Sequence, residues 1–164
     1  MRTTNLPRAL SPDDAAAFAD RVRRRRGVVV FTNGVFDLLH PGHVRYLAEA
    51  RRLGDALIVG VNSDRSVRGN KGPARPINRV EERVEILLSL ASVDAAVIFD
   101  EDTPLAVITR IQPDVLVKGS DWGPDNIVGR DVVEQRGGRV VRVALAQGFS
   151  TTNLIEKRRP GQSS

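Results

Sequence analysis

Uninterrupted runs of apolar residues recur along this chain, and they restrict its fold more than any other feature of the sequence. One covers residues 56–61 and reads Ala-Leu-Ile-Val-Gly-Val, and shorter runs occupy residues 28–30 and 115–117. A strand that does not alternate between apolar and polar side chains is buried on both faces, as in a parallel sheet that helices cover. The runs therefore predict a parallel sheet inside the molecule.

Segments with helical periodicity separate the predicted strands. The clearest spans residues 78–91, where positions 80, 84, 87, 88 and 91 are apolar. This alternation predicts an α/β fold: a Rossmann-like, doubly wound, five-stranded parallel sheet in a single domain. The expected strands are residues 28–32, 56–61, 95–99, 114–118 and 139–143, and the expected helices are residues 41–53, 78–91, 103–111, 125–136 and 151–158. Residues 62–76, rich in Gly, Pro, Arg and Lys, are expected to form a mobile loop.

The ends of the chain differ from its middle. Residues 1–27 are expected to be an N-terminal extension with a short helix, because Ser11 and Pro12 form a helix start and Gly27 a plausible stop. Residues 28–158 are expected to be the main domain, and residues 159–164 a disordered tail.

Composition bounds the class of protein. A chain of 164 residues with 41% hydrophobic residues is long enough to bury a substantial core in one domain. No apolar run approaches the ~20 residues that a membrane span needs, and no signal-peptide segment is visible. The chain has no cysteine, which excludes disulfides, thiol nucleophiles and cysteine-bound metals. A cytoplasmic protein that does not enter membranes is expected.

A net charge of +5 raises the question of nucleic-acid binding. Basic residues cluster at 23–26 and at 157–159, near the edges of the folded pattern. The alternative is a solvated helix end and a frayed tail, where arginine complements the helix dipole. We favour the alternative because no aromatic residues are interleaved with the basic ones, as single-strand binding would require.

Both histidines of the chain lie in one tetrapeptide, His40-Pro41-Gly42-His43, between a predicted strand and a predicted helix. If His40 caps the helix, Pro41 takes its first position and His43 lies one turn further on the same face. Gly42 leaves the exposed N–H groups open to a ligand, and the helix dipole favours an anion there. A surface turn is the alternative. Metal binding by the pair is disfavoured because zinc needs three or four protein ligands.

Several segments together resemble one family. They are the strand end at residues 32–37 with the His-Pro-Gly-His element, Val61 to Asp64, Arg75 to Asn78, Leu116 to Trp122, and Gly148 to Asn153. In this order they resemble the cytidylyltransferase-like nucleotidyltransferase superfamily, most closely the adenylyltransferases of ADP-heptose synthesis, which act on D-glycero-β-D-manno-heptose 1-phosphate. The resemblance covers about residues 28–157. It implies transfer of an adenylyl group from ATP to a heptose 1-phosphate, with Mg²⁺ and in a homodimer.

Site residues follow from the resemblance and from their places in the pattern. The expected catalytic residues are His40, His43 and Lys118. The expected nucleotide-binding residues are Asn33, Gly34, Val35, Phe36, Gly42, Lys71, Gly119, Ser150, Thr151 and Thr152. The expected substrate-binding residues are Asp37, Arg75, Asp121 and Trp122. No metal site made by protein residues alone is expected, because magnesium would be held mainly by the nucleotide phosphates.

Some of these assignments have alternatives. Asp37 fits a local capping residue as well, Lys71 and Arg75 fit solvated loop cations, and Trp122 fits a packing residue. Ser150 to Thr152 fit plain helix caps. Glycerol-3-phosphate cytidylyltransferases carry an arginine a few residues before that segment, and residues 144–147 have none, which favours a heptose phosphate. A cytidylyl or guanylyl transferase for another sugar or polyol phosphate, and a non-catalytic nucleotide- or nucleic-acid-binding module, remain open, as does the preferred triphosphate.

Overall fold

The structure is a computed structural model that describes residues 6–121 and 123–145. In this part of the chain, five parallel strands form one sheet in the order β3-β2-β1-β4-β5. The strands are β1 (Val29–Gly34), β2 (Ala56–Asn62), β3 (Ala95–Phe99), β4 (Val115–Gly119) and β5 (Arg139–Val143). The helices are α1 (Pro12–Arg24), α2 (Pro41–Arg51), α3 (Asp64–Lys71), α4 (Val80–Leu88), α5 (Leu105–Ile111) and α6 (Arg130–Gln135), with a 3-10 turn η1 (Pro124–Asn126). The predicted doubly wound α/β fold is confirmed.

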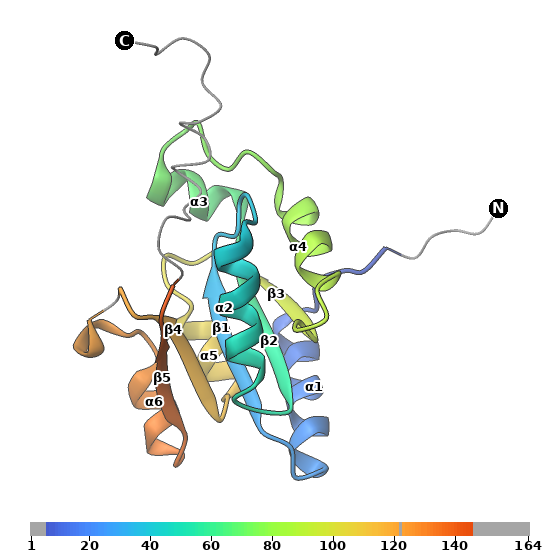
Figure 1. Cartoon of the computed structure of the whole chain (residues 1–164), viewed down its shortest axis with the longest axis vertical. Helices are drawn as coiled ribbons and strands as arrows, with labels where there is room; N and C mark the ends of the chain where they lie inside the picture. The colour runs from blue at the N-terminus through green and yellow to red at the C-terminus, as the bar shows by residue number, and fades with distance from the viewer. Residues whose placement is uncertain (1–5, 122, 146–164) are drawn as a thin grey trace, which may run out of the picture.

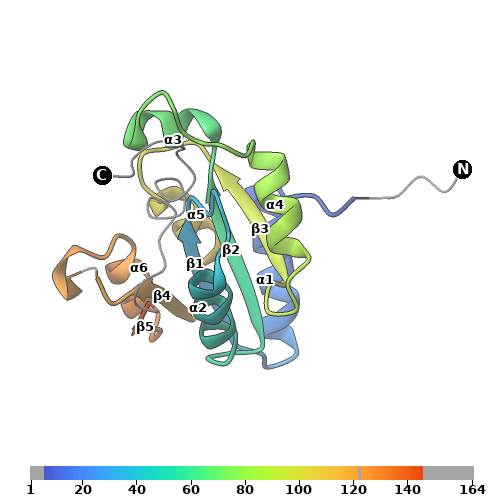
Figure 2. The same ribbon diagram turned by 45° about the horizontal axis from the view of Figure 1, so that its top comes forward.

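Helices cover both faces of the sheet (Figures 1 and 2). One face packs against α2 and α4, and the opposite face packs against α1, α5 and α6. Successive residues of a strand contribute to opposite cores: in β1, Val30 belongs to the first and Phe31 to the second, and both are fully buried. The absence of alternation in the apolar runs therefore reflects burial on both faces.

The helix of the expected N-terminal extension belongs to the second core. Ala15 and Ala19 of α1 are fully buried, and the helix lies against α5 and β3. Ser11 caps it as predicted, because its hydroxyl oxygen accepts from the Asp14 N–H at 3.0 Å. The helix ends at Arg24, three residues before Gly27.

The predicted mobile loop at residues 62–76 is wrong over residues 64–71, which form the α3 helix. Ser63 caps this helix, its hydroxyl oxygen accepting from the Ser66 N–H at 3.1 Å. Only Val67 among its side chains is both apolar and buried, so the helix has too few apolar residues to show a periodic pattern. A cap, rather than an apolar stripe, is the signal for this helix.

The predicted helix at residues 125–136 is also corrected. Gly129 adopts φ 89° and separates η1 from α6. A β-carbon there would lie 2.7 Å from the Ile108 Cδ1 atom, so both the backbone and the packing require glycine. The predicted helix at residues 151–158 lies outside the described residues.

In the part of the chain that the structure describes, no helix combines the length and the apolar character needed to cross a membrane.

Candidate functional site

A cleft of about 700 Å³ lies at the carboxyl ends of the strands, where parallel α/β sheets bind ligands. Its walls come from the segments that follow β1, β2, β3 and β4. Every predicted site residue that the structure describes lines it: Asn33, Gly34, Val35, Phe36, Asp37, His40, Gly42, His43, Lys71, Arg75, Lys118, Gly119 and Asp121. Trp122, Ser150, Thr151 and Thr152 lie outside the described residues. The cleft therefore brings together segments far apart in sequence.

The histidine pair opens α2 as the sequence predicts. His40 is the N-cap, with extended backbone, and its Nδ1 accepts from the His43 N–H at 3.3 Å. The two imidazole rings stack, with centroids 3.8 Å apart and planes 17° from parallel. The Phe36 ring meets His43 edge-on, with centroids 5.5 Å apart. The alternative of a simple surface turn is wrong, since the tetrapeptide begins a helix and His40 is buried.

Both imidazoles favour the neutral form. Burial lowers the pKa of His40 below its usual value. Burial, together with the neighbouring His40, lowers the pKa of His43 to about 4, while the Leu38 carbonyl acts in the opposite direction. His43 Nδ1 is the one buried side-chain polar atom in the described residues without a hydrogen-bond partner. An anion bound against these rings would raise both pKa values, because a negative charge stabilises the imidazolium form.

Lys118 reaches the cleft from the end of β4. Its Nζ donates a hydrogen bond to Asn33 Oδ1 on the adjacent strand β1. Burial lowers the pKa of Lys118 to about 8. Behind it, Thr32 donates to the Val117 carbonyl at 3.0 Å and pairs with the Tyr46 hydroxyl at 2.8 Å, which ties β1, β4 and α2 together. A buried ammonium group at this position offers strong attraction to a phosphate.

Two glycines in the cleft let neighbouring side chains approach the backbone. A β-carbon on Gly34 would lie 2.8 Å from the Phe36 ring, and one on Gly119 would lie 2.5 Å from Asp121 Oδ1. Phe36 itself adopts φ 50°, a left-handed conformation that is rare for an aromatic residue. Such strain persists only where the surrounding structure enforces it, and it is common at ligand sites.

Asp37 holds the segment that carries Arg75. Its carboxylate accepts from Arg75 Nε at 2.8 Å, from the Asn78 N–H at 2.9 Å, and from the Ile77 N–H at 2.9 Å. Burial alone would raise the pKa of Asp37, but the hydrogen bonds from Asn78, Ile77 and Arg75, with the charge of Arg75, hold it below its usual value. Asp37 is therefore not a local cap, because its partners lie about 40 residues away along the chain.

Two cations, Lys71 and Arg75, line the cleft. Lys71 is the last residue of α3 and is exposed, so it lies on a helix rather than in the predicted loop. Arg75 is mostly buried beside Asp37, with 16% of its side-chain surface exposed. The alternative of a solvated loop cation is therefore wrong for Arg75, and it stays open for Lys71.

Sequence reasoning missed Arg83, which is 1% exposed and joins three segments of the site. It donates to the Val35 carbonyl at 2.7 Å, to the Asn78 carbonyl at 3.1 Å and to Asp64 Oδ1 at 2.8 Å. The signal was present: position 83 falls between 80 and 84 on the apolar face of the predicted helix. A charged residue on such a face needs buried partners. Asn62, Tyr46, Asp102 and Thr103 also line the cleft and were not predicted.

The described residues contain no group of three or more His, Asp or Glu side chains that could hold a metal ion. Asp37 is the most buried carboxylate in the cleft, and both of its oxygens already accept hydrogen bonds, from Arg75 and from backbone N–H groups. A divalent cation at this site would therefore need most of its ligands from the bound substrate.

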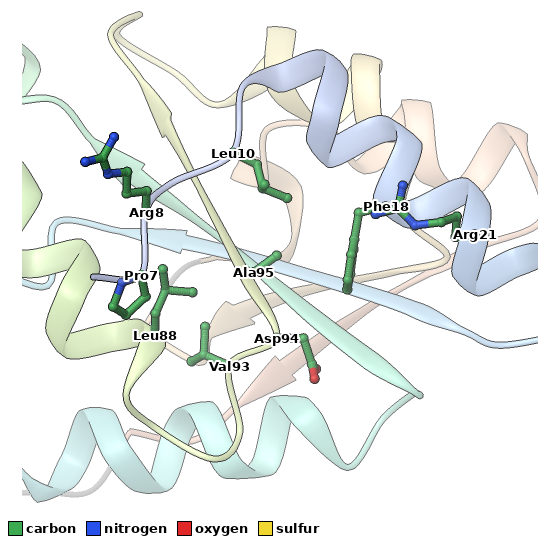
Figure 3. Close-up of a pocket in the computed structure, with 9 residues that line it drawn as sticks. All are labelled: Pro7, Arg8, Leu10, Phe18, Arg21, Leu88, Val93, Asp94 and Ala95. Carbon is green, nitrogen blue, oxygen red and sulfur yellow. The ribbon is translucent and has the colours of Figure 1, made fainter. Parts of the chain in front are cut away.

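A second, smaller hollow of about 360 Å³ lies beside the edge strand β3 (Figure 3). The N-terminal segment and α1 line it on one side, and Leu88 and Val93 line it on the other. Its lining is mainly apolar, and it contains none of the predicted site residues. The chemistry is therefore concentrated in the larger cleft.

Comparisons with known proteins agree with this geometry. Residues 31–157 match the family model described as cytidylyltransferase-like. The protein named "Bifunctional protein HldE" of Syntrophotalea carbinolica is 58% identical over 137 residues, which is 83% of this chain and 28% of that protein. The protein of the same name from Geotalea uraniireducens is 56% identical over 149 residues, 90% of this chain and 30% of that protein. The chain thus spans less than a third of the length of these curated relatives.

One solved structure matches this chain over nearly its own full length. The lipopolysaccharide core biosynthesis protein from Thermoplasma volcanium GSS1 superimposes with a TM-score of 0.63 at 30% identity, over 74% of this chain and 99% of that one. The structural likeness, the histidine pair at the start of α2 and the match over residues 31–157 lead to one conclusion: this chain belongs to the cytidylyltransferase-like family.

Proposed function

We propose that this protein transfers an adenylyl group from ATP to a heptose 1-phosphate, giving ADP-heptose and pyrophosphate. The observation that carries the proposal is the stacked pair His40 and His43 at the start of α2, in the same cleft as the buried ammonium group of Lys118. The resemblance of residues 28–157 to the adenylyltransferases of ADP-heptose synthesis supports the choice of substrates. The relatives named "Bifunctional protein HldE" and the lipopolysaccharide core biosynthesis protein support it as well.

In this reaction an oxygen of the sugar phosphate attacks the α-phosphorus of ATP. The bond between the α-phosphorus and the bridging oxygen breaks, and pyrophosphate leaves with the electron pair. The protein contributes positioning and electrostatic stabilisation, and no covalent intermediate on the chain is needed. The imidazoles and the N–H groups at the start of α2 would stabilise the charge on the α-phosphate. Each imidazole would contribute ~2–4 kcal/mol of transition-state stabilisation, which is the loss seen when one oxyanion-hole donor is removed from an enzyme.

Lys118, which reaches the same cleft from β4, would complement the same charge. Its low pKa would rise when a phosphate binds, because the nearby anion favours the ammonium form. Lys71 would contact the triphosphate and Arg75 the sugar phosphate. Mg²⁺ would enter with the nucleotide and be held chiefly by phosphate oxygens, since the described residues offer it no cluster of ligands.

The test is pyrophosphate release with purified protein, Mg²⁺, each of ATP, CTP, GTP and UTP, and either heptose 1-phosphate or glycerol 3-phosphate as the acceptor. We expect the fastest release with ATP, and a product with the mass of ADP-heptose. Release with another triphosphate, or with glycerol 3-phosphate, would assign a different member of the same reaction class. Absence of release with every pair would contradict the enzyme proposal and favour a binding module.

Two further parts of the proposal are a homodimer and a cytoplasmic location. Light scattering of the eluted protein would determine the oligomeric state, and fractionation of cells would determine the location. Nucleic-acid binding is not expected, and a salt-sensitive mobility shift of labelled nucleic acid would contradict that expectation.

A further inference from the structure

The cleft has two sides, separated by β1 and its histidine pair. In the strand order β3-β2-β1-β4-β5, Lys118 and Gly119 at the end of β4 lie on one side of β1, and Asn62 at the end of β2 lies on the other. Asn62 pairs in register with Phe99 at the end of β3, and Asp102 follows that strand. Both Asn62 and Asp102 line the cleft, and no role in the reaction has been assigned to either.

The hydrogen bonds of Asn62 fix which end of its side-chain amide faces the cleft. Asn62 is 7% exposed, and its Nδ2 donates to Ser66 Oγ at 3.0 Å. Ser66 has one hydroxyl hydrogen, which it gives to the Glu101 carbonyl at 3.4 Å, so its oxygen must accept from Asn62. An amide assigned in this way has its nitrogen against Ser66 and its oxygen on the other side.

The Asn62 oxygen is left as an acceptor at the cleft wall. Within the described residues it has no hydrogen-bond donor, and it is not among the buried atoms without a partner, so it is open to the cleft. A carbonyl oxygen cannot bind a phosphate oxygen, since both only accept hydrogen bonds. The nearby carboxylate of Asp102 has the same limitation and also repels phosphate. The Asn62 oxygen and the Asp102 carboxylate therefore suit hydroxyl groups, which can donate.

We propose that Asn62 is a specificity-determining residue, whose side-chain oxygen accepts a hydrogen bond from a hydroxyl group of the sugar phosphate. The proposal rests on the proposed function and adds that this wall of the cleft recognises the hydroxyl groups of the sugar phosphate. Arg75, which is ion-paired with Asp37, lines the same cleft and would supply positive charge for the phosphate of that substrate. Asn62 and Asp102 then distinguish a polyhydroxylated acceptor from a phosphate compound with few hydroxyls.

The experiment combines the variant Asn62→Ala with a set of heptose 1-phosphates in which one hydroxyl at a time is replaced by hydrogen. With the unmodified protein, one deoxy compound should lose about tenfold or more in kcat/KM, because an acceptor is left without its donor. In Asn62→Ala the KM for heptose 1-phosphate should rise about tenfold, while the KM for ATP should stay within twofold. The same deoxy compound should then have the same kcat/KM in this variant as unmodified heptose 1-phosphate has, because the hydrogen bond is already absent. Asn70→Ala is the matched control, because it removes another amide side chain from the cleft lining, leaves Asn62 and Ser66 in place, and should keep the loss of kcat/KM with the deoxy compound.

Other outcomes overturn the inference and separate it from the proposed function. If the unmodified protein is active and Asn62→Ala retains every deoxy penalty, the inference is wrong while the proposed function stands. If Asn62→Ala instead changes the KM for ATP and the loss of kcat/KM with 2′-deoxy-ATP, the Asn62 oxygen accepts a hydrogen bond from the ribose and the inference is again wrong. If the unmodified protein forms no nucleotide sugar, both fail. Asn62→Ser, which can still donate to Ser66, replaces the alanine variant if that variant does not fold.

Discussion

The imidazole rings of His40 and His43 lie face to face, with centroids 3.8 Å apart, at the positive end of the α2 helix. At that distance two imidazolium ions would repel each other strongly, and burial adds a further penalty for charge. The pair is therefore neutral at pH 7 in the ligand-free protein. A bound triphosphate supplies the negative charge that would permit protonation, so the pair can respond to the substrate.

The first prediction concerns the titration of His43. Its pKa should lie near 4 in the free protein, well below the usual 6.5, and should rise when ATP binds. His40→Ala should also raise it, because the neighbouring charge and part of the burial are removed. Proton–nitrogen NMR of the ring measures both shifts. Since the unfolded chain binds more protons than the folded one between about pH 4 and 6.5, the stability due to neutral His43 should decrease as the pH falls through that range. A midpoint near 6.5 in both proteins would contradict the geometry.

The second prediction is that Lys118→Met makes the protein more stable and inactive. With the pKa of Lys118 lowered to about 8, the folded chain carries a penalty for the ammonium charge at pH 7. That penalty is relieved as the pH rises from about 8 to 10.5, where the unfolded chain binds more protons. Methionine should raise the free energy of unfolding by about 1–3 kcal/mol. Urea unfolding measures this gain, and pyrophosphate release should fall by about 100-fold or more. A less stable variant would show that the bond to Asn33 outweighs the burial of the charge.

The third prediction concerns Arg83, which fixes the Val35 carbonyl in the predicted nucleotide loop. Arg83→Met should lower the free energy of unfolding by about 3–5 kcal/mol, because it leaves Asp64 and two carbonyl groups without their donor. Arg83→Lys should recover little, since one ammonium group cannot reproduce the fork of three N–H contacts. Arg110→Met removes an exposed ion pair with Asp13 and is the matched control, with an expected change below ~1 kcal/mol. If Arg83→Met and Arg110→Met lower the free energy of unfolding by the same amount, the prediction that Arg83 stabilises the site more than an exposed arginine is wrong.

The sheet and the histidine pair were predictable because their signals are local. Continuous apolar runs mark strands buried on both faces, and a cap, a proline and a glycine mark the start of α2. The α3 helix was not predictable from periodicity, since it is short and polar and depends on the Ser63 cap. The Asp37 contacts could not be predicted at all, because its partners are distant in sequence and include backbone N–H groups that no side-chain pattern encodes. Arg83 lies between these cases: its position showed that a charge was buried, but not with which partners.

The last prediction tests whether Asp37 organises the wall of the cleft rather than serving only as a substrate ligand. Asp37→Asn keeps the shape of the side chain, but in either orientation its N–H₂ group faces a donor: Arg75 Nε at the Oδ2 position, or the Ile77 and Asn78 N–H groups at the Oδ1 position. The free energy of unfolding should fall by about 2–4 kcal/mol at pH 7. In the unmodified protein, the stability due to this carboxylate is present above its usual pKa of 3.8 and is lost as the pH falls through its lower folded value. Hydrogen exchange at residues 77 and 78 should be faster in the variant than in the unmodified protein. The α5 amides, on the opposite face of the sheet, should exchange at the same rates relative to one another in both proteins. If exchange at 77 and 78 is unchanged while the KM for the sugar phosphate rises, Asp37 acts on the substrate directly and its contacts to this segment are secondary.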